Sequence, residues 1–463
     1  MTIKRRTFSL LAGTSVVALM VEKRQAFGQA TDSDFATLSK TTLTPVGAER
    51  AGNAAGTIPA WTGGMTSIPA GIDWDPDQEM PPDFWADEKP LYTINSSNMA
   101  QYADLLTDGV QTLIQKQGMT VPVYQTHRTA AAPQWVYDNI LANSSRAQLS
   151  PAGGRFGFTG GYGGIPFPIP DASNPLNAGA QVMWNHSTRW QGSSYVYSVY
   201  SWAISSGTPQ ITVHSTIEFY SPYYQQNGTY ESFNGKIYDQ AQTLLGPATI
   251  TGVKLLAEYS TNPYESPDIV WEVLPGQGRV RKAPELSYDT PSSYADGIAN
   301  YDEYYGFLGA LDRYDWKFIE KKEMLIPYNN NGLLHMSDAE LYGAKFLNGV
   351  RWELHRVWVV DATLHPGERN VLARRMIYVD EDTWVLALAD CWDASGSIYK
   401  LDMTVNGAFP NLPGTLLTNH LSYNLQTGDY TVIGGPFGSG PWVFKQVQMS
   451  FFEPQAMAAA AAY

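Results

Sequence analysis

Residues 195–220 read YVYSVYSWAISSGTPQITVHSTIEFY, and this stretch contains the pattern that decides the fold. Two runs rich in β-branched and aromatic residues, 195–204 and 211–220, flank a short turn sequence at 205–209. In the second run apolar side chains alternate with polar ones. This alternation has the period of a strand, and the turn residues between the runs predict a hairpin. The stretch therefore predicts an antiparallel sheet with one solvated face.

Strands of the same kind are expected along the rest of the chain. They are expected at 249–259, 268–274, 278–283, 321–327, 353–363, 371–379, 384–392, 397–404, 421–425 and 442–450. Helical spacing predicts one helix from Ser96 or Ser97 to Gly118, a second from Pro133 and a short third at 302–311. No segment repeats at a fixed period, which disfavours a propeller or solenoid. We therefore predict a mainly β, α+β fold, with a large curved antiparallel half-barrel sheet wrapped around a few helices.

Two segments rich in glycine and proline lack this periodicity. The first follows the N-terminus and is predicted to wrap across the body as an extended chain. The second, 150–180, is longer than an ordinary connection and is predicted to be a binding loop or lid. The predicted organisation has an export signal at 1–30, an N-terminal wrap and helix at 31–120, a curved-sheet ligand-binding domain at 121–450 and a loose alanine-rich tail at 451–463.

The N-terminus has the features of an export signal. Arg5 and Arg6 precede an apolar run from Leu10 to Val21, and small residues allow cleavage after about Ala30. This run is shorter than the roughly 20 residues that span a bilayer, so a cleaved signal is expected and not an anchor. The arginine pair favours the twin-arginine route, and an ordinary secretory signal is the alternative. Either route predicts a soluble protein in the periplasm.

Composition limits the classes of partner. The formal net charge is −14, and removing residues 1–30 makes it four units more negative, because that segment has five basic residues and one acid. Such acidity argues against nucleic acid or anionic lipid as the main partner. The single cysteine, Cys391, excludes an intramolecular disulfide. The 28 Tyr, 17 Phe and 14 Trp residues suit sheet packing as well as binding of a carbohydrate or lipid.

No motif for established catalytic chemistry is present. The seven histidines lack zinc-type spacing, and the chain has neither a Gly-x-Ser-x-Gly elbow nor a phosphate-binding glycine-rich loop. No catalytic residue, cofactor or metal is therefore predicted, although two histidines could still meet across strands. Paired carboxylates would suffice for a hydrolase. The candidates are Asp312, Asp315, Asp361, Asp380, Glu381 and Asp382. Residues 380–382 fall between two expected strands, where acids usually form a solvated turn.

Aromatic residues on the expected strands can fill a core or line a cavity. A strongly curved sheet makes a cavity plausible, because its concave side is either filled by helices or left open. The predicted ligand-binding residues are Trp202, Phe219, Trp271, Trp358 and Trp384. The predicted lid residues in the 150–180 loop are Phe156, Phe158, Ile165 and Phe167.

Several blocks of sequence resemble a known family. The blocks cover residues 43–64, 271–284, 312–329, 352–364 and 374–393. They resemble the exported bacterial proteins catalogued as domain of unknown function 1329, often labelled outer-membrane lipoprotein-sorting proteins. The resemblance implies a fold similar to the periplasmic lipoprotein carrier and receptor of the Lol pathway, with an apolar cavity. It also implies partnership with an inner-membrane lipid or drug exporter and an outer-membrane channel-like protein.

The first block contains a motif of Glu49, Arg50, Asn53 and Trp61. This motif could form a functional surface, or it could pin the N-terminal wrap to the sheet. Three functions remain open: a carrier that takes a hydrophobic ligand toward the outer membrane, a structural adaptor between an exporter and a channel, and a carboxylate-dependent hydrolase. A carrier that is not an enzyme is the preferred prediction. Its cargo could be a lipoprotein, a free lipid, a sterol, a terpenoid or a polyketide-like molecule.

Overall fold

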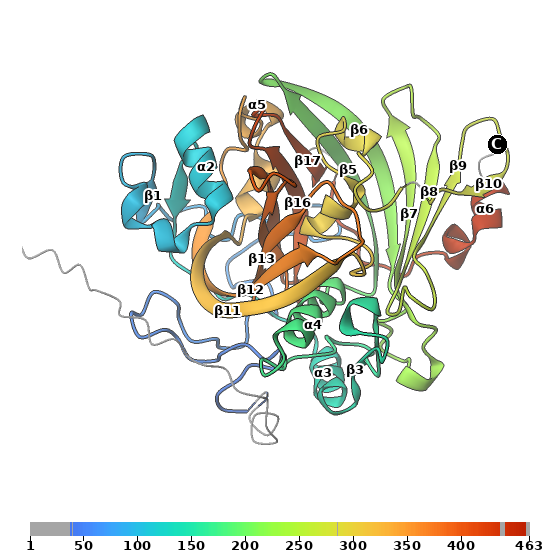
Figure 1. The fold of residues 1–463 in the computed structure, drawn as a ribbon, viewed down its shortest axis with the longest axis horizontal. Coiled ribbons are helices and arrows are strands. Elements are labelled where there is room, and N and C mark those ends of the chain that lie inside the picture. Colours follow the sequence, from blue (N-terminus) through green and yellow to red (C-terminus); the bar gives the residue numbers. More distant parts are fainter. Residues whose placement is uncertain (1–37, 39, 285, 436–439, 460–463) are drawn as a thin grey trace, which may run out of the picture.

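The computed structural model describes residues 38, 40–284, 286–435 and 440–459 (Figure 1). The predicted export signal at 1–30 lies outside these residues. Among them, no helix combines the length and the apolar character needed to cross a bilayer.

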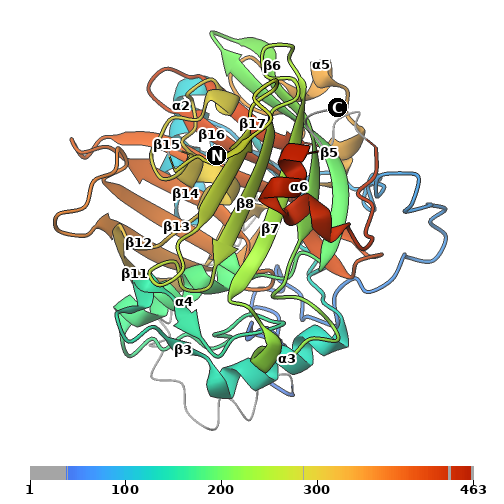
Figure 2. The ribbon, with the colours of Figure 1, turned by 90° about the vertical axis from the view of Figure 1, so that its right-hand side faces the viewer.

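One large sheet of 15 strands forms most of the protein. Its strands follow the order β1, β2, β12, β13, β14, β15, β16, β17, β5, β6, β7, β8, β9 and β10, and β11 pairs with β12. All pairings are antiparallel except a single parallel contact between β2 and β12. The sheet curves and stays open, because no pairing joins its two ends (Figures 1 and 2). The predicted mainly β fold with an open, curved antiparallel sheet is therefore confirmed.

The strands differ widely in length. They are β1 (Tyr92–Ile94), β2 (Val121–Val123), β5 (Ser194–Ser205), β6 (Thr208–Tyr220), β7 (Lys236–Gly246), β8 (Lys254–Ser260), β9 (Ile269–Val273), β10 (Val280–Lys282), β11 (Tyr314–Pro327), β12 (Trp352–Leu364), β13 (Arg374–Asp380), β14 (Leu386–Trp392), β15 (Ile398–Phe409), β16 (Gly414–Asn424) and β17 (Tyr430–Gly435). A separate hairpin pairs β3 (Gln148–Leu149) with β4 (Phe158–Thr159). The hairpin predicted from residues 195–220 is β5–β6.

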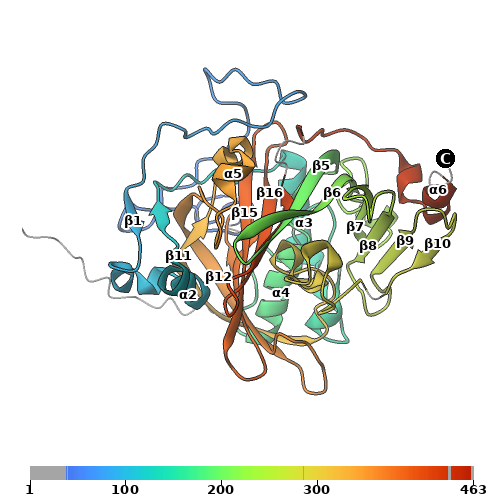
Figure 3. The same ribbon diagram turned by 90° about the horizontal axis from the view of Figure 1, so that it is seen from above.

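Five α-helices accompany the sheet in the described chain: α2 (Asp108–Gln117), α3 (Gln134–Arg146), α4 (Pro175–Ser187), α5 (Asp338–Leu341) and α6 (Pro454–Ala459). Two parts of the sheet are named by their strands: β11 to β16 form the β11–β16 arm, and β5 to β10 form the β5–β10 arm. Helix α4 lies inside the curve, between these two arms (Figures 1 and 3). Its Trp184 belongs to a buried core with Trp316 and Trp358. Helix α2 covers the opposite face, where Leu113 packs in a second core with Leu388 and Leu401.

A glycine lets α4 approach the sheet closely. A Cβ atom built on Gly179 would lie 2.3 Å from the carbonyl oxygen of Trp316 on β11. Any larger residue must therefore push the helix away from the strand. This close approach explains how α4 fills the concave side of the β11–β16 arm.

The predicted helix from residue 96 to Gly118 is wrong in its first half. Only Asp108–Gln117 is α-helical, and two 3-10 turns, Met99–Gln101 and Ala103–Leu105, precede it. Thr107 begins α2, because its side chain accepts a hydrogen bond from the Val110 amide. The helix ends at Gly118, whose left-handed conformation suits glycine.

Other boundaries also differ from the predictions. Strands β7 and β17 have no counterpart among the predicted strands. Residues 442–450, predicted as a strand, form only the bridge of Val443 to Val196. Helix α4 begins inside the segment 150–180 that was predicted to be a loop. The described part of the predicted loose tail, 451–459, contains α6 and the end of the 3-10 turn Met449–Phe452. Phe452 and Met457 pack against the outer face of β7 and β8 (Figure 2). Apolar contacts far away in sequence thus order the tail.

Candidate ligand-binding cavity

A cavity of about 410 Å³ lies on the concave face of the β5–β10 arm. Residues on one face of four adjacent strands form its wall. They are Tyr197, Val199 and Ser201 of β5, Val213 and Ile217 of β6, Tyr238, Gln240 and Gln242 of β7, and Leu255, Ala257 and Tyr259 of β8. No α-helix lines this cavity among the described residues; segment 286–312, which contains the 3-10 turns Ser293–Ala295 and Tyr301–Gly306, closes it instead. Figure 3 shows this yellow segment between β16 and β7.

Tyrosine is the main residue type of the lining. Besides those on the strands, the tyrosines are Tyr264, Tyr288, Tyr294, Tyr301, Tyr304 and Tyr305. Burial raises the pKa of Tyr197 and Tyr238 well above the ordinary value, because desolvation disfavours the phenolate. These hydroxyls are neutral near pH 7, so the wall offers apolar ring faces together with neutral hydrogen-bonding groups.

Polar side chains without partners occupy one end of the cavity, on β16. Both side-chain polar atoms of Asn419 and the Nε2 atom of His420 have no hydrogen-bond partner in the described chain, although the two residues are only 2% and 1% exposed. Burial lowers the pKa of His420 to about 3, so its ring is neutral at physiological pH. Buried polar groups are normally paired, and leaving one unpaired costs about 1–3 kcal/mol. This end is suited to a polar group of a ligand.

Two carboxylates line another part of the wall. Asp268 accepts a hydrogen bond of 2.8 Å from the Ser260 amide, and Asp312 accepts one of 3.0 Å from the Tyr288 hydroxyl. Desolvation is the largest cause that raises the pKa of Asp268, to about 7. Near neutral pH this carboxyl can therefore be either a hydrogen-bond donor or an anion.

Phe156 also contributes to the cavity lining, together with Tyr264. Their ring centroids lie 5.0 Å apart, and the guanidinium of Arg155 lies 4.6 Å from the Phe156 ring. Tyr264 is 64% exposed, so this pair stands where the cavity meets solvent. Of the four predicted lid residues only Phe156 lines the cavity. Phe158, Ile165 and Phe167 are buried in the core with Trp184, and a lid role stays a prediction.

The five predicted ligand-binding aromatics lie outside the lining of the large cavity. Trp358 and Trp384 stack on each other at 5.6 Å in the core around α4, which also contains Phe219. Trp202 belongs to the core on the opposite face, and Trp271 packs with the cluster beneath α6. The structure does not bring these residues together as one site, and their role in binding stays a prediction.

The N-terminal motif contacts the sheet at several points. Glu49 lies 3.4 Å from Arg356 of β12, and Asn53 donates a 3.0 Å hydrogen bond to Glu323 of β11. Trp61 donates from its indole nitrogen to the Ala130 carbonyl and lies 5.0 Å from the Arg50 guanidinium. These are the contacts expected if the motif pins the N-terminal segment, which runs outside the sheet (Figure 1).

The six candidate acids do not gather in the large cavity. Asp315 pairs with His365, Asp361 with Arg374 and Asp382 with Arg128. The expected solvated turn at 380–382 is wrong: Asp380, Glu381 and Asp382 are buried, because cations from β11, β12 and residue 128 converge on the turn. Asp380 and Asp382 lie close together in this turn, outside the lining of the large cavity. Only Asp312 of the six lines that cavity, so no pair of these carboxylates faces it.

Sequence reasoning missed most of the residues that form the cavity, apart from Phe156 and Asp312. A local signal was present, because residues 288–305 contain five tyrosines within 18 positions and lie outside the predicted strands. The polar pair Asn419 and His420 carried no such signal, since its burial depends on elements more than 100 residues away.

Comparisons with known proteins agree with the sequence blocks. Residues 93–458 match the family model described as "Protein of unknown function (DUF1329)". An uncharacterized protein of Pseudomonas aeruginosa, PA3922, is 34% identical over 440 residues, which cover 93% of each chain.

Solved structures are also similar to parts of the chain. A putative outer-membrane lipoprotein-sorting protein domain from Vibrio parahaemolyticus covers 61% of this chain and 99% of its own, with 12% identity and a TM-score of 0.42. A DUF1329 family protein from Desulfovibrio piger gives the same coverage and TM-score, with 14% identity. The family model and the Pseudomonas relative both extend over most of the sequence, and the chain therefore belongs to the DUF1329 family.

Proposed function

We propose that this protein binds a hydrophobic ligand that carries a polar group and transfers it through the periplasm. The observation that supports this proposal is the cavity of about 410 Å³ inside the β5–β10 arm. An engineered cavity of about 150 Å³ in another protein holds benzene. A cavity almost three times larger has room for a fused ring system or a folded part of an acyl chain.

The energetics suit reversible capture. Each methylene removed from water contributes about 0.8 kcal/mol, whereas association and ordering remove several kcal/mol. A ligand with ten or so buried carbon atoms is therefore held firmly but not permanently, as a carrier requires. The tyrosine faces favour ring systems such as a sterol or terpenoid, and Asn419 and His420 would bind a hydroxyl or carbonyl group.

Ligand binding can be tested with oleic acid, cholesterol and phosphatidylethanolamine as probes, by native mass spectrometry and by the shift in melting temperature. We expect a 1:1 complex with at least one probe. Ala257→Trp places a large ring in the cavity lining and should weaken binding at least tenfold. Leu245→Trp is the control, because Leu245 is 44% exposed and lies outside the lining. Absence of binding by every probe, or equal binding by Ala257→Trp, would contradict the proposal.

The location and partners are part of the same proposal. We infer export by the twin-arginine route, for which replacing Arg5 and Arg6 by lysines should retain the protein in the cytoplasm. Export of that variant at the normal rate would favour the ordinary secretory route. Cross-linking in cells would test whether an inner-membrane exporter or an outer-membrane channel-like protein receives or supplies the ligand.

A further inference from the structure

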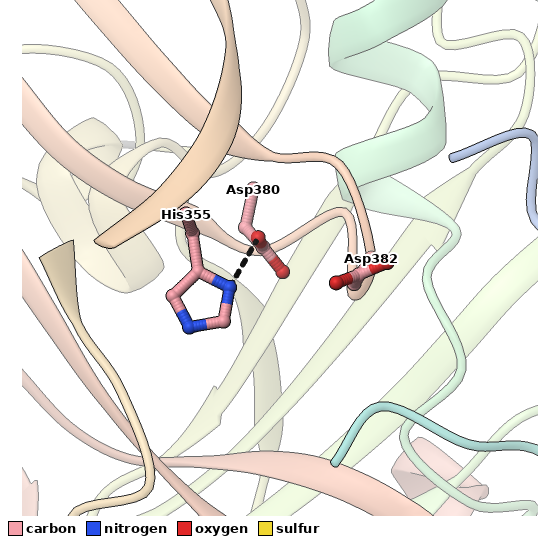
Figure 4. Close-up of side chains that lie close together, drawn as sticks. All are labelled: His355, Asp380 and Asp382. Carbon is pink, nitrogen blue, oxygen red and sulfur yellow. Dashed lines mark ion pairs between the residues drawn. The ribbon is translucent and has the colours of Figure 1, made fainter. Parts of the chain in front are cut away.

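Three buried side chains from different parts of the β12–β14 region converge outside the large cavity (Figure 4). His355 is on β12, Asp380 ends β13 and Asp382 lies in the following turn. One donor atom from each lies within 4.8 Å of the others. The residues are 1%, 1% and 4% exposed. Metal ligands about 2.1 Å from an ion lie about 3.4 Å apart in a tetrahedral site, so small side-chain movements would bring these donors to that spacing.

Asp380 has an oxygen without a hydrogen-bond partner. Its Oδ2 atom accepts hydrogen bonds from the Thr383 amide at 2.8 Å and from the Thr383 hydroxyl at 2.6 Å. Its Oδ1 atom has no such partner among the described residues and lies 3.8 Å from Nδ1 of His355, beyond hydrogen-bond distance. Figure 4 shows this oxygen directed toward the imidazole. A buried carboxylate oxygen in this state is costly unless a further group binds it.

The histidine is held in the orientation of a metal ligand. Its Nε2 atom lies 3.2 Å from Oε2 of Glu353, which leaves Nδ1 directed toward Asp380. Glu353 is itself fixed by the Arg351 guanidinium at 2.6 Å and by the His127 amide at 2.8 Å. A carboxylate on the remote nitrogen is the usual support of a metal-binding histidine.

The ion pairs around the three residues form two groups with different charge balance. Around Asp382, the three acids Glu49, Glu381 and Asp382 pair with the three bases Arg128, Lys321 and Arg356. Around His355, the three acids Glu88, Glu353 and Asp380 have one permanently charged base, Arg351, and two histidines, His127 and His355. Protons on the two histidines would balance the second group, and a divalent cation at His355 and Asp380 would balance it with both histidines neutral.

We propose that His355, Asp380 and Asp382 bind one divalent transition-metal ion. One imidazole and two carboxylates form a mixed nitrogen and oxygen donor set of the kind that Zn²⁺ or Mn²⁺ accepts. Asp382 keeps its contacts with Arg128 at 2.7 and 2.8 Å, since each carboxylate oxygen has a second lone pair.

Metal binding at this place would be structural. Arg128 connects Asp382 to the N-terminal segment, because its guanidinium donates hydrogen bonds to the carbonyls of Glu49, Arg50 and Pro59. The ion would thus fix the turn to which the N-terminal segment is attached. This inference is independent of the ligand in the large cavity.

The metal can be measured directly on the purified full-length mature protein. We expect about one equivalent of Zn²⁺ or Mn²⁺ per chain by mass spectrometry of the elements, either as purified or after treatment with a chelator and addition of the ion. The bound ion should raise the melting temperature. Asp380→Asn should weaken metal binding at least tenfold.

Asp390→Asn is the matched control. Asp390 is also a fully buried aspartate with one unpartnered oxygen, but it lies on β14 and its partners are Thr107 and Gly109. This variant should keep wild-type metal affinity. Equal affinity in the two variants, or no saturable binding of either ion by the wild type, would overturn the proposal. The wild-type titration remains decisive if Asp380→Asn does not fold.

Discussion

The two arms of the sheet have the same antiparallel construction but different interiors. In the β11–β16 arm, α4 approaches the strands closely and large indoles fill the remaining space. In the β5–β10 arm, smaller side chains such as Ala257, Ser201 and Val199 alternate with tyrosines, and a segment with only short 3-10 turns takes the place of the α-helix. Curvature alone therefore does not create a cavity. In the described part of the chain, the cavity lies where no α-helix covers the concave face.

The comparison also separates two uses of aromatic residues. Trp316 donates its indole hydrogen to the Leu311 carbonyl at 2.8 Å and contacts Phe307 edge-on at 4.8 Å, so it is fully satisfied within the core. The tyrosines of the other arm face open space with their rings. Trp184, Trp316 and Trp358 fill the interior of the β11–β16 arm, whereas tyrosines line the cavity of the β5–β10 arm.

The largest expected effect comes from emptying the filled arm. Trp316→Ala should lower the free energy of unfolding by about 3–5 kcal/mol, because it removes a large side chain that is only 2% exposed. Denaturant unfolding followed by circular dichroism would measure this. Trp316→Phe should cost clearly less. A loss below about 1 kcal/mol for the alanine variant would show that this arm is not tightly packed.

The next effect concerns the close contact between α4 and β11. Alanine normally stabilises a helix relative to glycine by about 1 kcal/mol. At Gly179 we expect the opposite sign, a loss of about 1–3 kcal/mol, because the added methyl group meets the Trp316 carbonyl. The melting temperature of Gly179→Ala would measure it. Leu176→Ala, at a 53% exposed position of the same helix, is the control and should change little. A stabilised Gly179→Ala would contradict the close approach.

A smaller effect concerns pH and the hollow arm. The pKa of Asp268 is raised to about 7, so between about pH 4 and pH 7 the folded state binds more protons than the unfolded state. Its contribution to stability is therefore present at low pH and is lost as the pH rises through 7. Asp268→Asn should remove on the order of 1 kcal/mol of this dependence, since the half-buried group faces the cavity.

Melting temperatures of wild type and Asp268→Asn, measured from pH 4 to pH 8, would test the sign. Asp77→Asn is the control, because Asp77 is exposed and lies outside the lining of the cavity. Parallel curves for wild type and Asp268→Asn would refute the raised pKa.

The smallest effect on stability is expected at the polar end of the cavity. Asn419→Leu replaces unpartnered polar atoms by apolar ones of similar size, so the free energy of unfolding should stay constant or rise by up to about 1 kcal/mol. Affinity for a probe with a hydroxyl group should fall, whereas affinity for the corresponding hydrocarbon should not. A marked loss of stability would mean that the amide has a structural partner.

Local pattern was sufficient for much of the sheet but not for the site. The alternation at 195–220 predicted β5 within one residue at each end and β6 except for its first three residues, and Pro133 marked the start of α3. The alternation of β7 was overlooked, and α4 was hidden in a glycine- and proline-rich segment whose helix is stabilised by packing on β11. The five aromatics predicted to bind ligand lie outside the lining of the large cavity. The presence of a residue on a strand does not tell whether a helix fills the concave space beside that strand.

The sequence by itself determined the antiparallel strand pattern, the acidic character and the membership of the DUF1329 family, because these depend on residue types and short-range order. Only the tertiary structure decided which arm is hollow and which acids are buried. The reason is distance along the chain: Asp382 is 254 positions from Arg128, and Asn419 lines the same cavity as Tyr197. The curvature of the sheet and the placement of the helices bring such residues together, and no short stretch of sequence predicts these contacts.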